Sequence, residues 1–127
     1  MEKKLYAKLT VRLYTDEKCF GPGVAALLAG VGDGHSLRAA ALSMEMAYSK
    51  AWKIIKQAEA GLGFPLLHSS VGGRGGGGAT LTAEGARLLA AYEGYCKALE
   101  DCGESLFAAH FGDLALPADT VGRENET

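Results

Sequence analysis

The sequence has few cysteines, and their spacing fits neither a metal site nor a disulfide framework. Cys19, Cys96 and Cys102 are an odd number, include no C-x-x-C pair and have no histidine nearby at metal-ligand spacing. Cys96 and Cys102 are six residues apart, which is about 240° around a helix, so they would not converge on one ligand. We therefore interpret all three as small apolar residues.

The sequence also lacks a long hydrophobic run. Lys8 and Arg12 interrupt the amino-terminal segment before the core of a signal peptide could form. The most apolar stretch, residues 24–31, is far shorter than the roughly 20 residues that a membrane-spanning helix needs. We expect a cytoplasmic protein that makes no contact with a membrane.

Patterns of catalytic residues are missing as well. His35, His68 and His110 are isolated from one another in the sequence, and no serine lies in a G-x-S-x-G elbow. No pair of carboxylates suggests a cleft. We predict that the protein is not an enzyme and that it holds no cofactor or metal.

An overall excess of positive charge, common in nucleic-acid-binding domains, is absent too. The net charge is −2, with a pI of about 5.9. However, residues 47–87 contain five Lys or Arg and two Asp or Glu, whereas residues 88–127 contain two and eight. Because charges beyond about one Debye length are screened, the basic middle third can attract phosphate by itself.

Hydrophobic periodicity predicts the elements of the first half of the chain. Strict alternation from Leu5 to Tyr14 predicts a half-buried strand. Apolar residues at helical spacing predict a short helix over 24–31. Ser36 is a good N-cap for a second helix that runs to about Ser43, and a tight turn follows at 44–46.

The middle of the chain predicts a third helix and a hairpin. The helix is expected over 47–60, with Trp52 beside its apolar stripe and more suited to the core than to base stacking. Residues 66–70 and 79–81 are expected strands on either side of a glycine-rich turn. The G-x-G-x-x-G match in this turn is weak as a dinucleotide fingerprint, because no helix opens on its last glycine. A flexible linker is the remaining alternative to a wing.

A long helix is predicted over 82–111, and its apolar residues follow a heptad repeat. Such a narrow stripe suits a partner helix in a second copy, or alternatively packing against its own domain. The predicted dimer-interface residues are Leu88, Tyr92, Tyr95, Leu99, Cys102 and Leu106.

The order of these elements indicates a mainly α fold with a small β component, a winged helix-turn-helix with a long C-terminal dimerisation helix. We expect the DNA-binding domain over 1–81 with its wing at about 66–81, the dimerisation helix over 82–111 and a flexible tail over 112–127. Taken alone, the lysines of the third helix could be an ordinary solvated face, but the surrounding elements favour DNA. The predicted DNA-binding residues are Ser36, Tyr48, Ser49, Lys50, Lys53, Lys56, Gln57, Arg74 and Gly75.

The run from Gly34 to Tyr92, with its segments AYSKAWKIIKQAEAGLGFPLL and VGGRGGGGATLTAEGARLL, resembles the amino-terminal domain of ModE-type molybdate-responsive transcriptional regulators. The similarity extends over roughly residues 5–107. It implies a LysR-like winged helix domain that dimerises through its last helix and binds a pseudo-palindromic operator in double-stranded DNA. It also implies DNA contacts by Ser49, Lys50 and Lys53 and, on the wing, by Arg74.

The sequence departs from this family in several places. The molybdate-binding domains do not follow the long helix, so we do not expect this chain to bind molybdate. Ala47 replaces the usual serine before the third helix, Glu45 takes the place of a glycine in the turn, and His68-Ser69 replaces Glu-Arg before the wing. These losses leave open a rival role, a protein-interaction module that works with a separate sensor chain.

Overall fold

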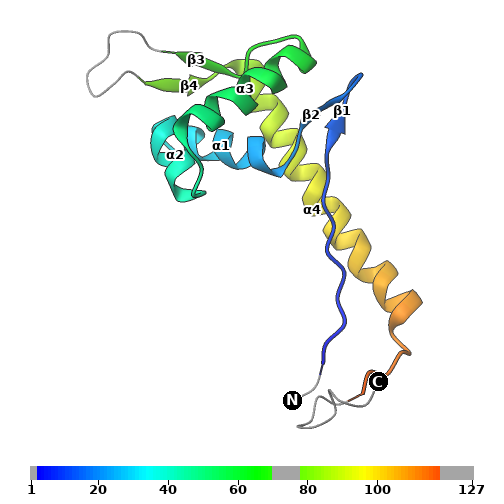
Figure 1. Cartoon of the computed structure of the whole chain (residues 1–127). Coiled ribbons are helices and arrows are strands. Elements are labelled where there is room, and N and C mark those ends of the chain that lie inside the picture. The colour runs from blue at the N-terminus through cyan, green and yellow to red at the C-terminus, as the bar shows by residue number, and fades with distance from the viewer. Residues whose placement is uncertain (1–2, 70–77, 118–127) are drawn as a thin grey trace. The chain divides into compact units, whose positions relative to one another are not determined.

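The computed structural model describes residues 3–69 and 78–117. The described residues divide into two units, one within residues 10–96 and one that combines residues 3–9 with residues 97–117. Figure 1 shows the order of the helices and strands along the chain. The chain is mainly helical with two small antiparallel strand pairs, which confirms the predicted fold class.

Helix α1 (Pro22–Gly32) starts at a proline in the first helical position, where the fixed φ of the ring suits a helix and no N–H is wasted. Val24, Leu27, Leu28 and Val31 recur at helical spacing, and all four are buried. Leu27 and Leu28 are fully inaccessible to solvent. This helix therefore supplies the centre of the core in the larger unit.

Helix α2 (Leu37–Ser43) packs closely against α1. Ser36 caps it, because the Ser36 Oγ accepts a hydrogen bond from the N–H of Ala39 at 2.9 Å. A Cβ atom at Gly30 of α1 would lie only 2.8 Å from the Cβ of Ala40, so this approach needs a glycine. In the turn that follows, Glu45 has a φ of 55°, a left-handed conformation that glycine adopts more easily.

Helix α3 (Tyr48–Leu62) completes the helix-turn-helix. One face buries Ala51, Ile55 and Ala58 against the core. The helix ends at Gly63, which has a φ of 88° and donates its N–H to the carbonyl of Glu59 at 2.8 Å. The predicted third helix is therefore present and extends two residues further.

Strands β3 (Leu67–Ser69) and β4 (Ala79–Leu81) form the predicted antiparallel pair, with Leu67 opposite Leu81. They are the arms of the expected hairpin. The glycine-rich segment between them, including Arg74 and Gly75, lies outside the described residues.

The predicted strand from Leu5 to Tyr14 is wrong over most of its length. Only Leu13–Tyr14 form a strand, β1, which pairs with the unpredicted β2 (Lys18–Phe20). Residues 3–10 are exposed and have no regular secondary structure. Alternation along a chain shows that it can form a strand, but not that a neighbouring strand exists to pair with it.

Helix α4 (Ala83–Phe111) begins inside the larger unit. Its N-cap is Thr82, whose Oγ1 accepts a hydrogen bond from the N–H of Gly85 at 2.8 Å. Further along, the Tyr92 ring meets the buried Phe20 edge to face, with ring centroids 5.0 Å apart. The first half of α4 is thus part of the core of this unit.

The smaller unit has no buried residue among those that the structure describes. Its amino-terminal segment lies beside the second half of α4, since a Cβ at Gly103 would be 3.3 Å from the Cδ1 of Leu9 (Figure 1). Over the described ranges 3–69 and 78–117, no helix is both long and apolar enough to cross a membrane.

Candidate nucleic-acid interface

The exposed face of α3 brings together most of the predicted DNA-binding residues. At about 100° per residue, five of them fall within roughly a third of the helix circumference, opposite the buried stripe. All five are exposed: Ser49, Lys50, Lys53, Lys56 and Gln57. The helix therefore presents three cationic side chains with a hydroxyl and an amide on one surface, a mixture that suits phosphate oxygens and base edges.

The first turn of α3 leaves backbone donors without a side-chain cap. The N-cap position is Ala47, which makes no side-chain hydrogen bond, and the first turn contains no acidic residue. This bears out the loss of a cap inferred from the missing serine. The N–H groups at a helix start carry partial positive charge, so a phosphate oxygen could accept hydrogen bonds from them.

Lys56 differs from the other two lysines because it has a partner within the chain. Its Nζ lies 3.4 Å from the Oε1 of Glu59 and 5.4 Å from the ring centroid of Trp52. Lys50 and Lys53 have no such ion pair among the residues that the structure describes. Of the three, Lys56 is therefore the least free to neutralise a phosphate.

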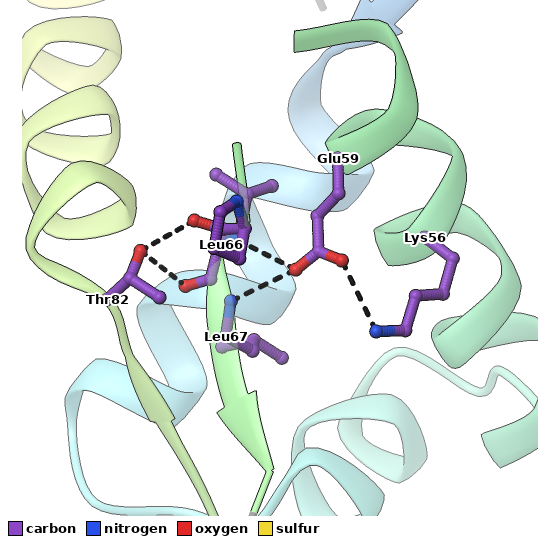
Figure 2. A network of polar contacts seen from close by, with 6 residues as sticks. Lys56, Glu59, Leu66, Leu67 and Thr82 are labelled. Carbon is purple, nitrogen blue, oxygen red and sulfur yellow. Dashed lines mark hydrogen bonds and ion pairs between the residues drawn. The ribbon is translucent and has the colours of Figure 1, made fainter. Parts of the chain in front are cut away.

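Glu59 also fastens the strand that leads to the wing, as Figure 2 shows. Its Oε2 accepts hydrogen bonds from the N–H groups of Leu66 at 2.7 Å and Leu67 at 3.2 Å. The two residues are buried, and Leu67 opens β3. One carboxylate thus connects the end of α3 to the start of the hairpin.

Thr82 makes the matching connection on the other side of the hairpin (Figure 2). Only 2% of this residue is exposed, and its hydroxyl donates to the carbonyl oxygen of Pro65 at 2.7 Å while it caps α4. The Thr82 N–H donates to the carbonyl of Leu66 at 2.9 Å. Both arms of the hairpin are therefore anchored to helices at their base.

The remaining predicted DNA-binding residues have different surroundings. Ser36 is exposed, but its hydroxyl oxygen already caps α2. Tyr48 is partly buried and lies outside the exposed face of α3, close to the buried Ile55 on the helix circumference. Arg74 and Gly75 fall outside the described residues.

Arg38 was not predicted from the sequence, although it lies in the same region. It is exposed in the first turn of α2, and its guanidinium carbon is 4.1 Å from the centroid of the Tyr48 ring. The two residues are ten apart and belong to different helices, so helical spacing gives no sign of the contact.

The predicted dimer-interface residues of α4 fall into three groups by their exposure. Tyr92 is buried in its own unit, where its hydroxyl donates to the carbonyl of Val11 at 2.7 Å. Burial raises the pKa of Tyr92, so the phenol keeps its proton and remains a donor. Leu88 and Leu99 are partly buried, whereas the last group is open to solvent: Tyr95, Cys102 and Leu106. Tyr92 is therefore a core residue rather than a surface for a partner.

No group of three or more potential metal ligands occurs in the part of the chain that the structure describes. Its three cysteines are free, and Cys19 is buried beside α3, where a Cβ at Gly61 would be 2.6 Å from the Cys19 Cβ. Cys19 thus packs as a small apolar residue.

Comparison with known proteins agrees with this geometry. Residues 25–86 match the family model described as bacterial regulatory helix-turn-helix protein, lysR family, and they contain α2, α3 and the hairpin. The chain is also 40% identical over 67 residues to the molybdenum-pterin-binding protein MopB of Rhodobacter capsulatus. That match covers 53% of this chain and 25% of MopB, so the chain spans about a quarter of this relative. Residues 25–86 therefore form a helix-turn-helix domain of the lysR-family type, which resembles that of ModE-type regulators and suggests DNA binding in transcription regulation.

Proposed function

We propose that this protein is a sequence-specific transcriptional regulator that binds a pseudo-palindromic operator as a homodimer. The observation that carries the proposal is the exposed face of α3, which lies in a helix-turn-helix domain and gathers Lys50, Lys53 and Gln57 with no acidic residue in its first turn. Because DNA binding requires access to the chromosome, we place the protein in the cytoplasm.

In this proposal the residues of α3 have separate roles. Lys50 and Lys53 neutralise phosphates, which sets affinity and orientation. The hydroxyl of Ser49 and the amide of Gln57 can each donate and accept hydrogen bonds, so these side chains contact base edges in the major groove. Arg74 and Gly75, in the glycine-rich tip, contact the flanking minor groove.

The smaller unit supports the homodimer. Among its described residues none is buried, yet it exposes many large apolar side chains: Leu5, Tyr6, Leu9, Leu106, Phe111, Leu114 and Leu116. A large exposed apolar surface is typical of an interface. We propose that a second copy covers it, and that Leu99, Cys102 and Leu106 of α4 take part. Tyr92 is not included.

We do not extend the binding property in the name of MopB to this chain, because the matching region is a quarter of that protein. We propose that neither molybdate nor a molybdenum pterin binds here.

The test is selection of bound duplexes from random DNA by the purified full chain at two salt concentrations. We expect enrichment of an inverted repeat, with binding that weakens steeply as salt rises. Lack of any enrichment at low salt would reject the regulator and favour the protein-interaction module.

Two variants test the role of α3 on the selected duplex. Lys50→Ala and Lys53→Ala should each weaken binding and lower the slope of log K against log salt by about one. Lys56→Ala is the matched comparison, and its effect should be smaller because Glu59 already pairs with this lysine. Unchanged affinity and slope in the first two variants would remove α3 from the interface.

A further inference from the structure

Arg38 is an exposed cation whose position over an aromatic ring suits the binding of an anion. It is exposed on α2, and over the ranges 3–69 and 78–117 no ion pair includes it. Its guanidinium carbon stands over the Tyr48 ring, 4.1 Å from the centroid. A guanidinium stacked on an aromatic ring keeps its N–H donors at the rim of the plane, where they can still bind a second group.

The ring beneath Arg38 is held in place by the core. Tyr48 and Trp52 meet edge to face, with centroids 6.4 Å apart and an angle of 81° between the rings. Both are partly buried and pack against the hydrophobic core. Because this platform is fixed, Arg38 loses less rotamer freedom on binding than an unsupported surface arginine would.

We propose that Arg38, held over Tyr48, binds a phosphate of the DNA backbone beside the start of α3. The inference rests on the proposed DNA-binding function and extends the contact surface from α3 to α2. In a helix-turn-helix the first helix crosses the backbone while the second enters the major groove, so a cation on α2 faces phosphate rather than bases. The uncapped first turn of α3, which Tyr48 opens, adds positive potential at the same place.

Variants at Arg38 test the contact itself on the duplex selected by the wild-type chain. Arg38→Ala should weaken binding about tenfold and lower the salt slope by about one, as expected for the loss of one phosphate contact. Arg38→Lys keeps the charge but loses the planar group, so the slope should stay near that of the wild type while affinity falls about threefold. Urea unfolding verifies that each variant is folded.

Variants at Tyr48 test the platform. Tyr48→Phe keeps a ring and should weaken binding less than Tyr48→Leu does. Tyr48→Leu removes the ring and should weaken binding by about threefold without changing the salt slope, since no charge is lost. Wild-type affinity in Tyr48→Leu would overturn the platform role.

Lys53→Ala separates failure of this inference from failure of the proposed function. If Lys53→Ala weakens binding while Arg38→Ala leaves affinity and slope unchanged, the protein binds DNA through α3 and Arg38 has no part in it. If the wild type selects no duplex at low salt, the regulator itself is rejected. If Lys53→Ala and Arg38→Ala each lower the slope of log K against log salt by about one, the result supports the inference.

Discussion

The carboxylate of Glu59 connects the end of α3 to the residues at the start of β3. It accepts hydrogen bonds from the N–H groups of Leu66 and Leu67, and these residues are 0% and 5% exposed. Hydrogen bonds to a charged acceptor contribute about 1.5–3 kcal/mol each, and a buried donor that is left unpaired loses its hydration as well. The base of the wing is therefore sensitive to this single residue.

We predict that Glu59→Ala lowers the free energy of unfolding by about 2–4 kcal/mol, because two buried N–H groups lose their acceptor. Glu59→Gln should cost less, about 1–2 kcal/mol, since an amide oxygen can still accept both bonds. Urea denaturation at one protein concentration measures these changes. Glu93→Ala, at an exposed site on α4, is the control and should change stability by no more than about 0.5 kcal/mol. An equally small change in Glu59→Ala would show that water replaces the carboxylate.

The sequence alone predicted the exposed lysines of α3, but not the roles of Glu59 and Arg38. Spacing within one helix shows which residues share a face, and this was enough for Lys50 and Lys53. The partners of Glu59 and Arg38 lie beyond a turn, in β3 and α3. Their contacts depend on how the elements pack, which periodicity does not describe.

Helix α1 packs closely against α2, the first helix of the helix-turn-helix. Gly30 makes this close approach possible. A Cβ at this position would be 2.8 Å from the Cβ of Ala40. By contrast, a Cβ at Gly94 in α4 would meet no atom within 4 Å. A side chain would therefore clash at Gly30, whereas at Gly94 there is room for one.

We expect Gly30→Ala to destabilise the protein by about 1–3 kcal/mol, because the two helices must move apart. Gly94→Ala is the matched control and should stabilise it by about 0.5–1 kcal/mol, the gain in helix propensity with no clash. Thermal or urea unfolding of the two variants measures whether each substitution lowers or raises the free energy of unfolding. Stabilisation by Gly30→Ala would mean that α1 and α2 can separate at little cost.

Sequence patterns located the helices and the hairpin, and failed at the amino terminus. The three helices carry a 3.6-residue apolar period together with a proline start, a serine cap or a glycine end, so local and tertiary signals agree. Residues 5–12 alternate as a strand would, but no strand lies beside them within the described chain. β2 was missed because the residues before Cys19 and Phe20 are typical of a turn.

At the scale of the whole molecule, burial is distributed unevenly. All buried hydrophobic residues of the described chain belong to the unit formed by Thr10–Cys96. Ten large hydrophobic residues are exposed within the ranges 3–69 and 78–117, and seven of them belong to the other unit, which therefore gains little from folding by itself. A second copy that covers these side chains would supply the burial that is missing.

We predict that Leu9→Glu and Leu106→Glu each weaken self-association by at least about tenfold, because each would place a charge in the proposed interface. Sedimentation across a concentration series measures the monomer–dimer equilibrium. Leu42→Glu is the matched control: this leucine of α2 is 75% exposed but lies in the other unit, so its substitution should leave the equilibrium unchanged.

The same variants test whether DNA recognition depends on the dimer. Two α3 helices in successive major grooves would be roughly 34 Å apart, one turn of B-DNA, and only a dimer can hold both half-sites at that spacing. Leu106→Glu should therefore lose its preference for the inverted repeat over a single half-site, while its α3 surface is unaltered. If the variant is monomeric and still prefers the full repeat, adjacent binding on DNA, rather than the proposed interface, selects the half-site spacing.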